Sequence, residues 1–403
     1  MAGIKALRRV QLAKEATAGT PVYPPTMLWR GHGVLQDLRQ VVMRDEAIGT
    51  LAPYDSSYIP FLGGELPLED TAASFEQLPI LLACAVKNVV SGAADGGGTG
   101  KIYAYPLPNT AANTIKTYTG LAGDNEDVEV IEHLFCKQLV LSGKPGEALK
   151  VNVDLEGRQV TSVRATVTAT FVTATHKITA ASGLAIFKTG MTIRVSGSTS
   201  NNGVFTVSTG NVAGEIVVTE ALVDEVATAG VLIRLEFAPV AVPTVEEILF
   251  SKGKLYLDAV GSAFGTTLVS TTLLGMNLTL KTGWQTIEAA DGALYFSSIK
   301  NVPWELTVQV TFEHNASSLA EKAYWRAGTP RKMRLLFEGS ALATAGAYAA
   351  KSLVMDLAGK WVTFDPLGEQ NGNDIVTATF KVAYDPTAAA SGTITVVNNV
   401  ASF

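Results

Sequence analysis

Apolar and polar residues alternate with a period of two along much of this chain, and this pattern restricts the fold more than any other feature. From Trp304 to Glu313 every second residue is apolar, and the residues between them are Glu, Thr or Gln. Successive side chains of a strand point to opposite faces, so the segment predicts a strand with one buried and one polar face. Similar strands are expected at Leu149–Leu155, Met276–Leu280, Leu353–Leu357 and Ile375–Val382. The chain is therefore predicted to be mainly β.

Only two segments favour a helix. In residues 74–87, Ser74 is a candidate N-cap, Gln77 follows three residues later, and Pro79 lies near the first turn, where a proline is tolerated. In residues 317–327 a helical pattern is followed by Gly328, a typical C-terminal stop.

Residues 165–236 differ in composition from the rest of the chain. They are rich in Val, Thr, Ala and Gly and contain no Trp, Tyr, Pro or Cys. Several short strands are expected here, and Asn202-Gly203 is a strong hairpin signal. We interpret 165–236 as a small inserted β module, with residues 1–164 and 237–403 as the two parts of its host domain.

Composition limits the environment and the partners. Hydrophobic residues make up 47% of the chain and charged residues 17%, yet no apolar run approaches the roughly 20 residues of a membrane-spanning helix. The N-terminal segment has no signal-peptide pattern, so no membrane insertion is expected. The apolar excess favours burial between subunits. A net charge of −6 argues against tight nucleic-acid binding.

No catalytic or metal-binding constellation is found. Asp95–Ile102 lacks the first glycine and the magnesium-binding hydroxyl of a phosphate loop. Cys84 is expected to be a buried, reduced thiol, and the histidines are expected to lie at the surface or to be hydrogen-bonded: His32, His133, His176 and His314. We predict no cofactor, no metal and no enzymatic activity.

Several short motifs, taken together in their order along the chain, are similar to those of one protein family. They are Val10–Pro21, Trp29-Arg30-Gly31, Glu46–Gly49 to Tyr58, Thr71–Leu82, Ser142–Ala148, Asp154–Gln159, Ser251–Asp258, Thr282-Gly283-Trp284, Phe312-Glu313-His314, Leu336–Gly339, Gly359-Lys360-Trp361 and Gln370–Asp374. Together they cover most of residues 1–164 and 238–398, and the chain resembles the tail tube (major tail) proteins of long-tailed, siphovirus-like phages.

That resemblance implies a β-sandwich or half-barrel with a flanking helix, and six copies in each ring of a stacked, hollow tube. It implies a virion protein assembled in the host bacterial cytoplasm. The implied partners are further copies of the chain, a tape-measure protein, a tail terminator and distal tail or baseplate proteins, while DNA transits the lumen without specific binding. The alternative is another phage structural protein, such as a capsid decoration or minor tail (adhesin) protein. A carbohydrate-binding role for the insert is disfavoured, because it has no Trp or Tyr to stack on sugars.

The segment Arg44–Leu68 contains three prolines and three glycines and lacks helical periodicity. Long loops of this kind are usually functional. We expect a loop or splayed hairpin that packs on the next ring; the alternative is that it folds back over its own core. Its apolar residues are Leu51, Tyr54, Tyr58, Ile59, Phe61 and Leu62.

The polar faces of two predicted strands are candidates for the lumen. They present Asp154, Glu156, Glu305 and Glu313. A negative or neutral wall would not retain DNA, whereas a basic wall would bind it through counterion release. An ordinary outer solvated face is the equally weighted alternative.

Overall fold

The computed structural model describes residues 3–46, 49, 51, 54, 56–269, 273–387 and 389–403. Strands dominate these residues, with two α-helices among them, α1 (Leu78–Ala85) and α2 (Ala316–Arg326), so the predicted mainly-β class with a flanking helix is confirmed. All five strands expected above are present, as β11 (Lys150–Gly157), β21 (Leu273–Lys281), β24 (Glu305–Glu313), β26 (Ala350–Phe364) and β28 (Asn373–Val382).

Both helices occur where the sequence predicts them, but their first residues differ. The Ser74 hydroxyl accepts the Gln77 N–H at 3.3 Å and so stabilises a turn that precedes α1. Helix α2 is capped by Asn315, whose side chain accepts the N–H groups of Ser317 and Ser318. Gly328 follows α2 with a φ of +63°, as a C-terminal glycine should.

The connectivity of the strands repeats along the chain. The first module contains β1 (Arg9–Lys14), β2 (Met27–Trp29), β3 (Gln36–Asp37), β4 (Gln40–Met43), β5 (Ser57–Phe61), β6 (Gly64–Ala72), α1, β9 (Tyr118–Gly123), β10 (Val128–Gly143), β11 and β12 (Val160–Ser162). The second module contains β19 (Gly253–Ala259), β20 (Leu268–Val269), β21, β22 (Trp284–Ile287), β23 (Ser298–Asn301), β24, α2, β25 (Arg331–Ala341), β26, β28 and β29 (Gly392–Asn398).

The antiparallel pairings of the two modules correspond strand by strand. Strand β1 pairs with β2 and β9, as β19 pairs with β20 and β25. The long strand β10 pairs with β9, β11 and β12, as β26 pairs with β25, β28 and β29. Strand β6 pairs with β3 and β11, as β24 pairs with β21 and β28. One folding unit therefore occurs twice, and this duplication was not predicted from the sequence.

Three short additions complete the modules. Strand β8 (Lys101–Pro106) extends the second module by pairing with β29, and β7 (Ala93–Ala94) pairs with β8. Strand β27 (Gly368–Gln370) forms a hairpin with β28.

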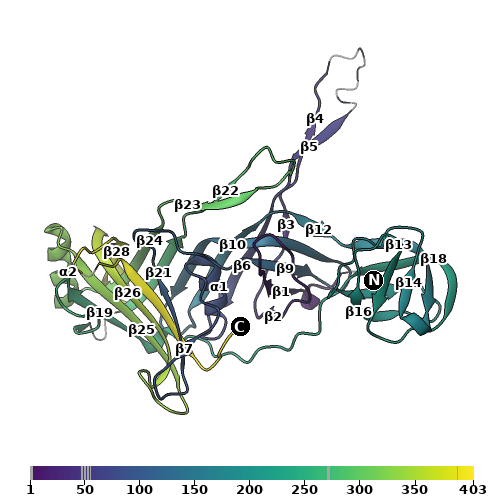
Figure 1. Cartoon of the computed structure of the whole chain (residues 1–403). Helices are drawn as coiled ribbons and strands as arrows, with labels where there is room; N and C mark the ends of the chain where they lie inside the picture. The colour runs from purple at the N-terminus through teal and green to yellow at the C-terminus, as the bar shows by residue number, and fades with distance from the viewer. Residues whose placement is uncertain are drawn as a thin grey trace.

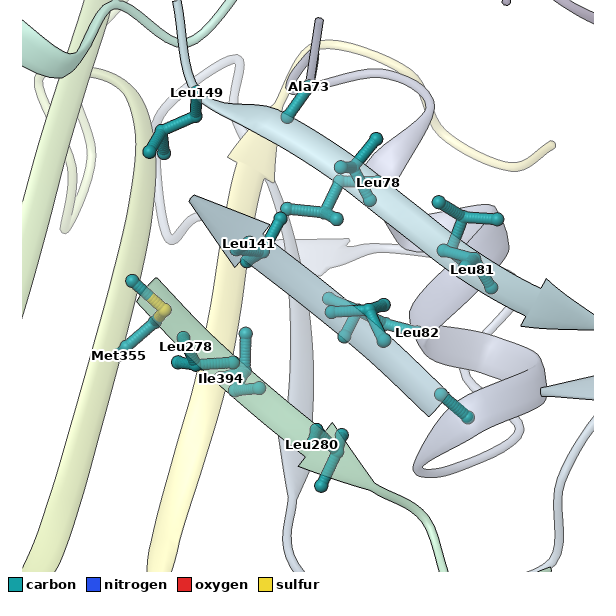
Figure 2. Packing of buried hydrophobic residues seen from close by; sticks show 14 of the residues in the cluster. Ala73, Leu78, Leu81, Leu82, Leu141, Leu149, Leu278, Leu280, Met355 and Ile394 are labelled. Carbon is teal, nitrogen blue, oxygen red and sulfur yellow. The ribbon is translucent and has the colours of Figure 1, made fainter. Parts of the chain in front are cut away.

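The two modules share one sheet and one core. Six residue pairs join β10 to β21, from Gln138 opposite Lys281 to Gly143 opposite Met276. The sheet therefore runs through β6, β11, β10, β21, β24 and β28. Figure 2 shows Leu78, Leu81 and Leu82 of α1 close to the β10–β21 junction, where the side chains of both modules meet.

Residues 164–235 form a separate closed barrel at the end of the molecule farthest from α2 (Figure 1). Its strands are β13 (Arg164–Val172), β14 (Lys177–Thr179), β15 (Thr192–Ser196), β16 (Gly203–Thr209), β17 (Glu215–Val218) and β18 (Glu225–Leu235). The barrel has its own core, which continues into the first module through Leu121, Val128 and Val130. The expected hairpin joins β15 to β16, but its connection is longer than a two-residue turn. Asn202 is the last residue of this connection and its side chain accepts the Ser198 N–H, while Gly203 is the first residue of β16.

Candidate assembly surfaces

The predicted inter-ring segment contains a hairpin, here called the outer arm (residues 40–61). Strands β4 and β5 pair from Gln40 opposite Phe61 to Met43 opposite Ser57 and project away from the rest of the molecule (Figure 1). The predicted boundary is wrong at one end, because residues 64–68 belong to β6 in the main sheet.

Most of the described apolar side chains of the outer arm are exposed. Leu51 is fully exposed, and Tyr54, Tyr58 and Ile59 are 52%, 49% and 37% exposed. The guanidinium of Arg44 lies over the Tyr58 ring at 6.0 Å. These exposures contradict the alternative in which the segment folds back over its own core. Phe61 and Leu62 lie at the base of the arm and are half-buried.

The corresponding hairpin of the second module, here called the docked arm (residues 284–301), lies against its own chain. The Leu62 N–H donates to the Leu294 carbonyl at 2.7 Å. Phe296 is buried and packs edge-on against Phe135, and the Arg158 guanidinium lies 5.2 Å from the centre of the Tyr295 ring. The docked arm therefore has one of its large apolar residues, Phe296, buried against its own chain, although Leu294 is 45% exposed, whereas Leu51, Tyr54 and Tyr58 of the outer arm are exposed.

The four candidate lumen residues lie on one face of the shared sheet. Cross-strand partners point to the same side, and Gln138 of β10 lies opposite both Asp154 and Lys281, while Lys281 lies opposite Glu305. Asp154, Glu156 and Glu305 are thus brought together on what we call the polar face, with Glu313 at the other end of β24. The opposite face carries the buried apolar residues of these strands.

Lysines from neighbouring strands offset the carboxylates of the polar face. Lys381 and Lys281 approach the Glu305 carboxylate at 2.7 and 3.4 Å, and their hydrogen bonds and charges lower its pKa. The Nζ atom of Lys137 lies 2.9 Å from Oε2 of Glu156. Partial burial acts to lower the Lys137 pKa, but the hydrogen bond to Glu156 and the charges of Glu156, Glu65 and Asp154 together raise it above its ordinary value. The face carries both signs of charge, and Lys137, Lys281 and Lys381 were not among the residues predicted from the sequence to lie on it.

The groups with potential chemistry are buried or engaged in structural contacts. Both cysteines are free and buried, as predicted for Cys84, and burial raises the Cys84 pKa to about 12. The Asp95 carboxylate accepts the N–H groups of Ala347 and Tyr348 and so joins two glycine-rich loops. Among the described residues, no group of three or more His, Cys, Asp or Glu side chains is arranged to hold a metal ion.

His133 departs from the expectation of a surface or hydrogen-bonded histidine. Its ring is buried, and neither ring nitrogen has a hydrogen-bond partner. The ring packs against Phe296 with the ring centres 5.0 Å apart. Burial, together with the nearby charge of Arg158, lowers its pKa to about 4. The neutral imidazole therefore serves as part of the apolar contact beneath the docked arm.

None of the helices in the described part of the chain is long and apolar enough to cross a membrane. Comparison with known protein families and with curated proteins finds no match for this sequence.

Proposed function

We propose that this chain is a structural virion protein that assembles into stacked rings and forms the hollow tube through which phage DNA passes. Its partners would be further copies of itself, a tape-measure protein in the lumen, and terminator and distal tail proteins at the tube ends. No catalytic step is assigned to it.

The observation that carries this proposal is the exposure of the outer arm. A two-stranded hairpin is at best marginally stable in water on its own, and this one exposes Leu51, Tyr54 and Tyr58 to solvent. Burying a large apolar side chain contributes about 1.5–3 kcal/mol. A surface that covers these side chains would therefore stabilise both the arm and the contact, and we assign that surface to the next ring.

The charge of the polar face is compatible with a lumen wall. Its carboxylates are interleaved with Lys137, Lys281 and Lys381, so the face carries little net charge in either direction. Ion pairs satisfied within the sheet leave fewer free cations for DNA phosphates, and a wall of this kind would not retain DNA by counterion release.

Negative-stain electron microscopy of the purified protein tests the proposal. We expect the unmodified chain to form stacked rings with a central channel. The triple variant Leu51→Ser, Tyr54→Ser, Tyr58→Ser removes the apolar contacts of the outer arm and should yield no stacks.

The matched control places Val204→Ser, Val212→Ser and Val226→Ser on exposed residues of the barrel, and it should stack normally. Stacks formed equally well by the arm variant would refute the role of the arm. Copies bound to capsids rather than to tails would favour a decoration protein instead.

A further inference from the structure

The junction between the two modules has three parts. Strand β10 pairs with β21 over six residue pairs. Helix α1 packs on β10 beside this junction, and all of its residues are buried. At the start of the docked arm, the Trp284 indole N–H donates to the Ala85 carbonyl at the end of α1.

Each strand of this junction has a counterpart in the other module. By the correspondence of pairings, β3 is the counterpart of β21, and β26 is the counterpart of β10. In the described structure β3 pairs with β6 alone, whereas β21 pairs with both β24 and β10. The far edge of β3 is therefore open, and the exposed side chains of Val34 and Leu38 flank it.

The end of β26 is open in the same way. Residues 359–364 pair with β28, and the Asp365 N–H continues this ladder by donating to the Thr377 carbonyl. In the first module, the equivalent end of β10 pairs with β11 on one side and β21 on the other. The described structure gives residues 362–367 no strand on their second side, and Val362 and Leu367 are exposed. The Val362 carbonyl accepts the Trp325 indole N–H of α2 at 3.2 Å and Pro366 has no N–H, so the remaining backbone groups of this segment are the ones available for pairing.

Helix α2 shows the same contrast with its counterpart. It packs on β26 as α1 packs on β10. Yet only Ser318 and Glu321 of α2 are buried, and Leu319 and Tyr324 are 51% and 40% exposed. The exposed apolar residues of α2 therefore lie where, in the first module, the second module covers α1.

We propose that residues 362–367 of one chain pair with residues 33–38 of a second copy, and so repeat between chains the β10–β21 junction found within the chain. The two edges are different surfaces of one chain, so the contact is heterologous and propagates from copy to copy until it closes a ring. It would also cover two open sheet edges, which are otherwise liable to aggregate.

This inference rests on the proposed ring assembly and alters its stoichiometry. Each chain supplies two modules, so a closed ring contains an even number of them. A ring with six module positions would be filled by three chains rather than six.

Two edge variants and light scattering after size-exclusion chromatography test the pairing. The β3-edge variant carries Val34→Lys and Leu38→Lys, and the β26-edge variant carries Val362→Lys and Leu367→Lys. Lysine on an edge strand opposes pairing, and all four positions are exposed, so folding should be retained. The control carries Val204→Lys and Val226→Lys in the barrel.

We expect the control to form rings and each edge variant alone to remain at the 42.4 kDa mass of one chain. An equal mixture of the two edge variants should give a dimer of twice that mass, because one intact edge of each kind remains. A mixture that stays monomeric, or an edge variant that forms rings like the control, would overturn the pairing.

Hydrogen–deuterium exchange of the unmodified protein gives a second measurement that needs no substitution. Residues 33–38 and 362–367 should exchange more slowly in rings than in monomers, and unchanged exchange in both segments would contradict the proposal. The outer-arm variant distinguishes the edge pairing within a ring from the stacking of rings through the arm, because this variant should form single rings that do not stack.

Discussion

The buried ion pair between Glu321 of α2 and Arg331 of β25 offers a sharp test of how α2 is held on the sheet. The Arg331 Nη2 lies 2.5 Å from Glu321 Oε1, and its Nε lies 3.1 Å from Oε2. The Trp361 indole N–H donates to the same Oε2 at 2.8 Å. Both charged side chains are less than one-tenth exposed.

The substitution Glu321→Gln keeps the size of the side chain but leaves Arg331 charged and buried without its anion. Breaking one side of such a pair costs about 3–5 kcal/mol. The cost should appear as a lower free energy of unfolding in urea, with faster hydrogen exchange in α2. Replacing both partners by methionine should recover part of this loss, because no uncompensated charge is then buried.

Glu147→Gln is the matched control. It makes the same chemical change in the exposed pair with Lys144, which has an Nζ–Oε1 distance of 3.3 Å, and exposed pairs contribute below about 1 kcal/mol. If Glu321→Gln destabilised the protein no more than this control, the buried charge of Arg331 without its anion would not cost the expected free energy, and the reasoning would be refuted. Because Trp361 directly precedes the open edge at residues 362–367, we also expect Glu321→Gln to lower the yield of rings.

Three further outcomes follow from buried groups. The pKa of His133 is about 4 in the fold and about 6.5 in the unfolded chain, so the unfolded chain binds more protons between these two pH values. The free energy of unfolding should therefore fall by up to about 3 kcal/mol as the pH drops from 6.5 to 4. In urea titrations, a His133→Gln variant should lack this part of the pH dependence. Cys84 and Cys136, whose pKa values burial raises, should resist a thiol reagent at pH 8 in the folded protein and react after denaturation; rapid labelling of the native chain would contradict their burial. Phe296→Ala should cost about 3–5 kcal/mol of local stability and speed hydrogen exchange in the docked arm, and protection equal to that of the unmodified chain would show that Phe296 does not anchor it.

The elements that the sequence predicts well are those whose signal is local. The alternation in Trp304–Glu313 led to β24, and the composition of residues 165–236 set apart the segment that forms the barrel. The start of α1 was less predictable. Ser74 carries a good capping side chain, but it caps a turn in front of the helix, a distinction that depends on how the preceding strand ends.

The candidate site was predictable residue by residue but not as an arrangement. Alternation places Glu305 on a polar face, yet the lysines beside it come from β21 and β28, one of them 76 positions away along the chain. Similarly, the sequence indicated exposed apolar residues in the outer arm, but it could not show that the docked arm is the corresponding hairpin and lies against its own chain. His133 was misjudged because the covering Phe296 is distant in sequence.

By itself the sequence determined the mainly β class, the two-faced strands, the helices and the apolar arm, because each depends on spacing between residues a few positions apart. Only the tertiary structure revealed the repeated module, the junction of β10 with β21 and the two open edges. Strand pairing is decided by which distant segments meet, and the two modules share their pairing pattern without an evident repeat in their residues. The pairing pattern consists of backbone hydrogen bonds, and the order of the side chains says little about which backbone segments pair.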